Sequence, residues 1–531
     1  MCPLQVSSAQ ICGAPICLSK GNSSSKSTGE NVLKAVEELI SDQPYTDTLQ
    51  VPKEKDFDFV SEESEVKSGT VLGAVALITG TTIGAGILAL PAAVAPAGFG
   101  PSSTVLLAAW TLLLGEALLI AEVNVAIMEE RKEYRREHGR PATQLTVGLA
   151  EMAGRTIGSE GQAAVTLGYL GTSGTLMVAY LAKSGEIFGQ ASQLSPETGA
   201  ALFATVMGLV LYVGGTQAAD VVNRFLTVAL LALFAGIAVV GGGQADWSLL
   251  SYGDWGQASS TVPVIFLALV YHDLIPVLCS YLGGDLRDVR KSIILGSLPS
   301  LVMFLTWNAI ALSVVSEHSG GSDPLKMLIE NAGPSLSLAV QGFSGAAICT
   351  SFIGTALALS DFAETQLSTV VDKVGEKVEI PRPVYKWWNK DGVRATALVL
   401  SLVPPCAIAC NNPDIFLGAA NFAGAYGMTT LYGILPPVMA WNMRGYLADT
   451  YGPSQQRSTD SSQVDEPNSD PSLIDRLQEL VPGGNPVLAG LALSAFAVQV
   501  MRASQDFGPQ IHELPKLVMA AASGVLDAPI G

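Results

Sequence analysis

The sequence predicts an all-α, polytopic membrane protein with about eleven transmembrane helices, two of them broken near the middle. Only 14% of the 531 residues are charged and 49% are hydrophobic, whereas soluble domains average about 25% charged residues. The apolar residues form long uncharged runs, and a helix needs about 20 such residues to cross a bilayer. Two of these runs carry helix-breaking residues at mid-depth. The low charge excludes a soluble protein, because two to four soluble domains would each need a charged surface.

The net charge of −18 belongs mainly to segments outside the predicted helices. Residues 30–67 form an acidic N-terminal tail, which we predict to be disordered, and residues 445–483 form an acidic linker. Together these segments hold 18 of the 47 acidic residues. An acidic chain repels phosphate backbones, so nucleic acid is disfavoured as a partner.

The first 29 residues have the composition of a transit peptide. They contain no acidic residue, two lysines and many serines, and they lack the continuous apolar run of a secretory signal. We therefore predict the plastid (chloroplast) inner envelope as the location, with the plasma membrane as the alternative. An ordinary disordered terminus is the competing interpretation of the same residues.

The sequence contains no metal or cofactor motif. The seven cysteines lack the spacing of zinc ligands, and there are only four histidines. Cys406 and Cys410 lie four residues apart in an apolar stretch and are interpreted as small packing residues. We expect no metal, no cofactor and no enzymatic activity, since no nucleophile with a base and no phosphate loop is present.

Eleven runs are long and apolar enough to be membrane spans. The first two lie in the 48-residue uncharged stretch from Ser68 to Gly115, which three prolines interrupt. By residue number, the other nine are 162–188, 197–215, 217–242, 261–284, 292–315, 335–362, 393–409, 415–441 and 484–501. We divide them into a first five-helix repeat at 68–243, a second at 260–444, an eleventh helix at 484–501 and a C-terminal tail at 502–531.

The basic residues support this number of spans independently. With the N-terminus inside, the inner segments hold 25 of the 29 Lys and Arg residues. Inner loops of membrane proteins are enriched in these residues. A miscount by one span would divide them about evenly, so the count and the orientation agree with each other.

The first predicted span is interrupted by a glycine-rich stretch. Residues 80–86 read GTTIGAG, and each glycine weakens a helix by about 1 kcal/mol relative to alanine. Taken alone, these glycines could equally form a packing face between helices. A dinucleotide-binding loop is excluded because no strand precedes them.

The sixth predicted span contains a second interruption, which decides between these interpretations. His272 and Asp273 stand just before Pro276 at mid-span. A charged Asp there costs about 2.5 to 3.5 kcal/mol on insertion scales, and Pro276 removes a backbone donor. Interruptions at matching positions in two halves indicate a transporter whose binding site lies at the midplane.

We predict that a small-molecule substrate binds between the two interruptions. A broken helix exposes N–H groups at one new end and carbonyls at the other, so it can bind the carboxylate and ammonium groups of an amino acid. The predicted substrate-binding residues are Gly80, Thr81, Thr82, Gly84, Ala85, Gly86, Tyr271, His272 and Asp273.

A series of short motifs runs in one order along residues 68–445. They are GTTIGAGILALP at 80–91, EVN at 122–124, MVAY at 177–180, VNR at 222–224, His272 with IP at 275–276, YLGGD at 281–285, SFIG at 351–354, DF at 361–362 and PP at 404–405. In this order they resemble the tyrosine- and tryptophan-specific transporters of the hydroxy/aromatic amino acid permease family, in the amino acid/polyamine/organocation superfamily.

The resemblance implies the five-plus-five inverted-repeat fold of the leucine transporter. It also implies secondary active, proton-coupled uptake of tyrosine, tryptophan or phenylalanine by alternating access. The chain departs from the usual family pattern at Lys183, Ser184 and Asp273. Another neutral amino acid therefore stays an alternative substrate.

Four ionisable residues inside the predicted spans are candidates to carry the coupled proton. Intramembrane acids are rare and commonly form proton relays, and imidazole has an ordinary pKa of about 6.5. A structural, hydrogen-bonded role is the competing interpretation for each. Two nearby pairs, Lys183 with Glu186 and Asp220 with Arg224, are predicted to be structural ion pairs. The proton-coupling candidates are Glu116, Glu122, His272 and Asp361.

The main rival function is a non-transporting amino acid sensor that uses the same scaffold and signals through its acidic tails. A channel is less favoured, because no filter-like repeat is present. The expected partners are thus an amino acid, protons and the lipid bilayer, and the sequence does not indicate an oligomeric state.

Overall fold

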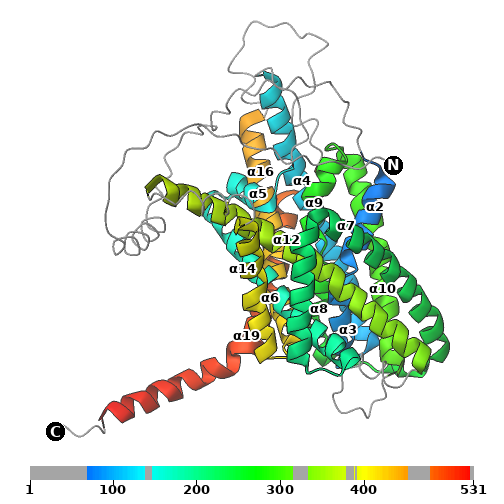
Figure 1. Ribbon diagram of the computed structural model, residues 1–531. Helices are drawn as coiled ribbons and strands as arrows, with labels where there is room; N and C mark the ends of the chain where they lie inside the picture. The colour runs from blue at the N-terminus through cyan, green and yellow to red at the C-terminus, as the bar shows by residue number, and fades with distance from the viewer. Residues whose placement is uncertain are drawn as a thin grey trace, which may run out of the picture. The chain divides into compact units, whose positions relative to one another are not determined.

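A computed structural model of the chain describes the predicted helical part (Figure 1). The residues it describes are 69–137, 146–314, 333–377, 388, 392–451 and 479–526. Residues 64–367 and 386–531 form one compact unit, which contains the helices discussed below. Of the second unit, residues 1–63 and 368–385, only the end of α12 is described. The predicted transit peptide, the acidic tail and most of the acidic linker lie outside the described residues.

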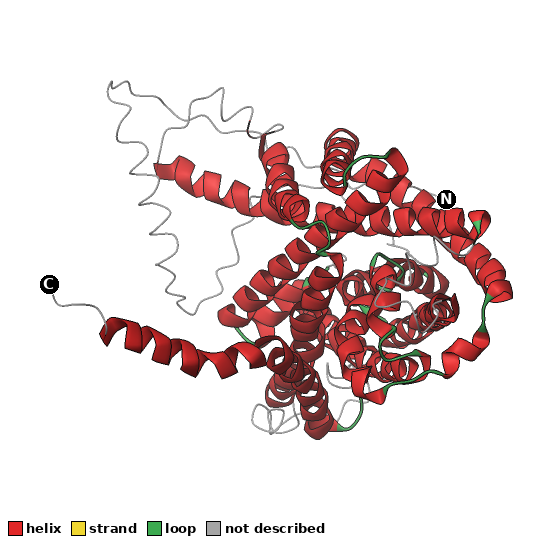
Figure 2. Cartoon of the chain, turned by 90° about the horizontal axis from the view of Figure 1, so that it is seen from below, coloured by secondary structure: helices red, strands yellow, loops and turns green. Residues whose placement is uncertain are grey.

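The described elements are helices, drawn in red in Figure 2, apart from an isolated bridge between Gly98 and Gly253. The first half contains α2 (Val71–Thr82), α3 (Gly86–Val94), α4 (Phe99–Glu137), α5 (Leu149–Thr156), α6 (Ser159–Ser192) and α7 (Pro196–Gln244). Then follow η1 (Trp247–Ser251), η2 (Trp255–Thr261), α8 (Val262–Leu269), η3 (His272–Leu274), α9 (Ile275–Tyr281), α10 (Leu286–Val314) and α12 (Pro334–Lys377). The rest are α14 (Val393–Asn411), α15 (Phe416–Phe422), η5 (Ala423–Met428), η6 (Thr430–Ile434), α16 (Leu435–Tyr451) and α19 (Gly484–Leu526).

Eleven spans can be traced through the described residues. By length and hydropathy, eight helices are candidate spans, and nine when the bent pair α2–α3 counts as one. Division of α7 at Gly215 adds a tenth span, and the uncharged run from α15 into α16 adds an eleventh. The predicted all-helical, polytopic architecture is confirmed, with the two interruptions in the first and sixth spans.

Gly215 makes α7 two helices rather than one. A continuous helix of 49 residues would extend about 74 Å, more than twice the bilayer core. Gly215 has φ 64° and ψ −164°, a conformation that L side chains rarely adopt. Before it, Gly199 packs against Gly185 of α6; after it, Gly241 packs against Ile310 of α10. The two parts therefore contact different neighbours.

The interrupted sixth span is the most enclosed of the candidate spans. In its most apolar window 72% of the residues are buried, against 22% for α7 and 11% for α19. The large apolar side chains exposed on α7, such as Leu209, Val213 and Phe225, are suited to contact lipid. The interrupted sixth span is thus enclosed by other helices, whereas α7 and α19 leave most of their surface exposed.

The tenth span is wound as a π-helix over η5 and η6. π-Helical segments are rare and occur frequently at functional sites. Gln499 of α19 supports this one, because its amide donates to the carbonyl of Tyr426 at 3.3 Å and to the hydroxyl of Thr430 at 2.8 Å. Gly424 approaches α8 so closely that an added Cβ would overlap the carbonyl oxygen of Pro263.

The substitution Gly424→Ala is therefore expected to destabilise the protein by about 1 to 3 kcal/mol, the usual cost of overpacking. Gly418 is the matched control in the same helical run, because a Cβ there meets nothing within 4 Å. Thermal unfolding in detergent should show a lower midpoint for Gly424→Ala than for Gly418→Ala. Equal midpoints would contradict the close approach of η5 to α8.

Candidate functional site

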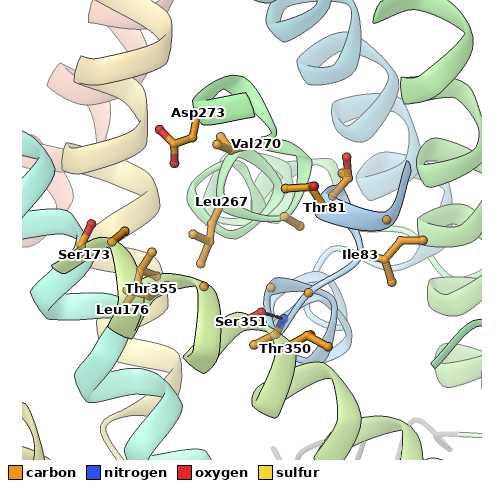
Figure 3. Close-up of a pocket in the computed structure, with 18 of the residues that line it drawn as sticks. Thr81, Ile83, Ser173, Leu176, Leu267, Val270, Asp273, Thr350, Ser351 and Thr355 are labelled. Atoms are coloured by element: carbon orange, nitrogen blue, oxygen red, sulfur yellow. Dashed lines mark hydrogen bonds between the residues drawn. The ribbon is translucent and has the colours of Figure 1, made fainter. Parts of the chain in front are cut away.

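A cavity of about 760 Å³ lies between the two interruptions, within the size range of small-molecule sites. Figure 3 shows its walls, which come from the α2–α3 break, α6, α7, the α8–η3 break, α12 and the π-helical segment. Seven of the nine predicted binding residues line it, namely Gly80, Thr81, Thr82, Gly84, Ala85, Gly86 and Asp273.

The α2–α3 break brings backbone close to two other helices. The two halves are bent by 55°. A Cβ on Gly86 would lie 3.1 Å from the Cα of Ala268 on α8, and one on Gly84 would lie 2.5 Å from the hydroxyl of Ser351 on α12. The N–H of Ala85 donates to that Ser351 hydroxyl at 2.8 Å. The glycines thus permit the contact, and α12 supplies a partner for a main-chain group freed by the break.

Two threonines near the C-terminal end of α2 bond back to the preceding turn of their own helix. The hydroxyl of Thr81 donates to the carbonyl of Leu77 at 2.8 Å, and that of Thr82 donates to Ile78 at 2.7 Å. Such bonds to the preceding turn tend to bend helices. The predicted weakness of this stretch therefore has a side-chain component as well as a glycine component.

α10 holds both halves of the broken helix. Pro91 has no N–H, so the carbonyl of Ile87 lacks its usual helical partner, and the indole N–H of Trp307 donates to it at 2.9 Å. On the other side of the break, the hydroxyl of Thr79 donates to the carbonyl of Gly296 at 3.0 Å. These two bonds tie α2 and α3 to one neighbouring helix.

The second break separates three residues that the sequence placed together. Val270 is extended, with φ −74° and ψ 125°, and Asp273 then faces the cavity. The hydroxyl of Tyr432 from η6 donates to the Asp273 carboxylate. By contrast, His272 is 1% exposed and its Nε2 contacts the carbonyl of Leu113 on α4 at 2.9 Å. Tyr271, at 3% exposed, is also absent from the cavity wall.

Several residues of the cavity wall were not among the predicted binding residues. Tyr180 and Ser351 stood inside the family-like motifs, so those motifs were the available signal. The remainder stood outside those motifs, except Asn223, which belongs to the VNR motif at 222–224. They include Tyr169, Thr172, Ser173 and Leu176 of α6, Asn223 and Thr227 of α7, Thr355 of α12, and Met428, Leu431 and Tyr432 of the π-helical segment.

None of the four proton-coupling candidates lines the cavity. Glu116 is fully buried on α4, and neither carboxylate oxygen has a hydrogen-bond partner among the described residues. Glu122 receives two bonds from Arg444, at 2.6 and 2.9 Å, and one from the N–H of Leu480 at 2.9 Å. Asp361 lies on α12, with its side chain exposed.

The two predicted ion pairs differ in outcome. The Lys183 ammonium and the Glu186 carboxylate are 2.7 Å apart, which confirms that pair. Asp220 and Arg224 form no ion pair among the described residues. Arg224 lies instead at the cavity wall, where it is exposed.

The model of the tryptophan/tyrosine permease family matches residues 67–450. The chain belongs to this family. It is therefore an integral, multi-pass amino acid permease and not an enzyme.

Individual relatives match this chain over most of their own length. The chain is 27% identical to "Tyrosine-specific transport system 1" of Haemophilus influenzae, covering 70% of this chain and 88% of that protein. It is 26% identical to the "Tryptophan-specific transport protein" of Pseudomonas aeruginosa, covering 67% and 82%. Among solved structures, it is similar to MhsT in complex with L-phenylalanine, with TM-score 0.48, 12% identity and coverage of 82% and 100%.

The contact between Trp307 and Ile87 can be tested by Trp307→Phe. This change keeps a ring but leaves the Ile87 carbonyl unpaired, which costs about 1 to 3 kcal/mol. Trp110→Phe is the matched control, because the buried Trp110 Nε1 has no hydrogen-bond partner among the described residues. In detergent, Trp307→Phe should lower the unfolding midpoint more than Trp110→Phe. The reverse order would refute the role of α10.

Proposed function

We propose that this permease transports an aromatic amino acid, tyrosine, tryptophan or phenylalanine, by alternating access and in symport with protons. The observation that carries the proposal is the cavity, whose walls combine the main-chain ends of two broken helices with aromatic and apolar side chains. The names of the similar tyrosine- and tryptophan-specific proteins support the substrate class.

The helix ends suit the two charged groups of an amino acid. α3 begins at Gly86 on the cavity wall. The N–H groups of Ile87 and Leu88 donate to the carbonyls of Gly84 and Ala85 at 3.2 and 3.1 Å, so it is the dipole of α3 that favours an anion at this end. α8 ends at Leu269, so its last carbonyls face the break and carry the opposite partial charge. We therefore place the substrate carboxylate at the start of α3 and its ammonium near the ends of α2 and α8.

The opposite wall suits an aromatic ring. Tyr169 and Tyr180 of α6, Leu267 of α8, and Met428 and Leu431 of the π-helical segment line the cavity. Aromatic side chains bury large apolar areas and pack well against other rings and against methionine. This lining favours a large planar side chain over a small aliphatic one.

The cavity's extent supports an inward-facing state. It reaches Leu77, before the break in α2, and Arg224 of α7, which lie toward the side that carries the basic loops. On the other side the N–H of Asp254 donates to the carbonyl of Ala97 at 2.8 Å. A cavity that is closed on the outer side and open on the inner side is one of the two states that alternating access requires.

Among the four candidates, the contacts favour Glu116 as the proton carrier. Glu116 lies one turn along α4 from Leu113, whose carbonyl binds His272. The Glu116 oxygens and His272 Nδ1 have no hydrogen-bond partner among the described residues. Such a carboxyl group can take up a proton without breaking an existing bond, whereas Glu122 is already held by Arg444.

Proteoliposome uptake of labelled tyrosine, tryptophan and phenylalanine under an imposed pH gradient tests the function. Uptake that exceeds the no-gradient control is expected, and no uptake of any of the three would overturn the proposal.

In the same assay Glu116→Gln should abolish pH-driven accumulation but spare exchange of substrate across the membrane. The control is Glu160→Gln, an exposed acid in the first turn of α6, which should behave as the unaltered protein. Accumulation by Glu116→Gln would assign the proton to another candidate.

The composition of residues 1–29 supports the plastid inner envelope as the location. A fluorescent protein fused after residue 60 should be imported into plastids if that segment is a transit peptide. Cytosolic fluorescence would overturn the assignment and favour the plasma membrane. Transport in proteoliposomes is independent of this result.

A further inference from the structure

Asp273 is the one acidic side chain on the cavity wall, among the residues the structure describes. The only other charged wall residue is Arg224. In Figure 3 the Asp273 carboxylate lies on the opposite side of Leu267 from Thr81. A carboxylate at this place is not needed to hold the substrate's charged groups, because the helix ends supply partners for both.

One tyrosine binds this carboxylate and two more line the same cavity. The Tyr432 hydroxyl donates to Oδ1, and Tyr169 and Tyr180 of α6 are residues of the cavity wall. No described residue donates a hydrogen bond to Oδ2, which leaves that oxygen to whatever occupies the cavity.

When a substrate enters the cavity, Oδ2 of Asp273 distinguishes rings that carry a hydrogen-bond donor from rings that do not. An aromatic ring that fills the cavity displaces water from the carboxylate, and an unpaired desolvated charge is costly. A phenol O–H or an indole N–H at the far end of the ring replaces the lost water. A phenyl ring has no donor and cannot do so.

We propose that Asp273, oriented by Tyr432, is a specificity-determining residue that binds a hydrogen-bond donor at the far end of an aromatic substrate. The permease then favours phenolic and indole amino acids over phenylalanine. This inference rests on the proposed function, because it assumes that an aromatic amino acid enters the cavity. It extends that function from a substrate class to an order of preference within the class.

Competition experiments with the unaltered permease give the first test. Uptake of labelled phenylalanine is inhibited with paired competitors, one with the donor and one without it: tyrosine against 4-fluorophenylalanine, in which fluorine replaces the hydroxyl, and tryptophan against 1-methyltryptophan, in which a methyl group replaces the N–H hydrogen. The donor-bearing member should inhibit at about 10-fold to 100-fold lower concentration, the ratio expected for one hydrogen bond to a charged group. Equal inhibition in both pairs would overturn the inference.

Variants then assign the effect to the carboxylate. Asp273→Leu should reduce the ratio within each pair to about twofold or less, with both members of a pair compared at the rate of phenylalanine uptake that the variant itself shows. Tyr432→Phe keeps the ring and removes the hydroxyl, so it should lower the ratio without abolishing uptake. The control is Asp246→Asn, at an exposed acid in the outer loop whose pKa is lowered by bonds from Ser248; it should retain the full ratio.

The outcomes separate this inference from the proposed function. If no aromatic amino acid is taken up, the proposed function fails. If all are taken up without discrimination, the function stands and the role of Asp273 fails. If Asp273→Leu loses phenylalanine uptake, Asp273→Asn is assayed, and loss there too would overturn the inference by indicating that Asp273 holds the ammonium group or the helix break.

Discussion

Main-chain groups freed by a helix break inside a membrane must find partners within the protein, and this constraint governs the site. Lipid offers no hydrogen bonds, so each unpaired N–H or carbonyl costs several kcal/mol. Ser351 binds the N–H of Ala85, and Trp307 binds the Ile87 carbonyl that Pro91 leaves free. The break is therefore possible only because α12 and α10 pass close to it. The groups that remain without a protein partner are the ones that a ligand can use.

Close approach explains why small residues and polar side chains occur together around the cavity. Gly84 and Gly86 have no side chain to separate the first span from α12 and α8. Gly424 does the same for the tenth span against α8. Because helices meet by their backbones at these points, single hydroxyl or indole groups can bridge them. The remaining space is the cavity, lined on one side by main chain and on the other by rings.

Local patterns in the sequence were enough to locate both breaks, but not to orient their side chains. The glycines of residues 80–86 and the pair before Pro276 identify weak points without any tertiary information. Whether His272 or Asp273 faces the cavity depends on a carbonyl of α4 that is 159 residues away. Tyr432 reaches Asp273 through a π-helical winding, which has no sequence signature. Long-range packing, rather than local propensity, therefore decides the composition of the cavity wall.

Gln499 of α19 bonds to the π-helical segment, so the eleventh helix cannot be separated from the preceding ten without a loss of contacts. The eleventh helix follows the ten spans that we predict to form two five-helix repeats, and that division alone would make it an accessory. The amide side chain of Gln499 nevertheless holds Tyr426 and Thr430, within a few residues of Tyr432. A chain shortened to its first ten spans would leave those two groups without this partner. The smallest unit that retains a complete cavity wall is accordingly asymmetric, with eleven helices.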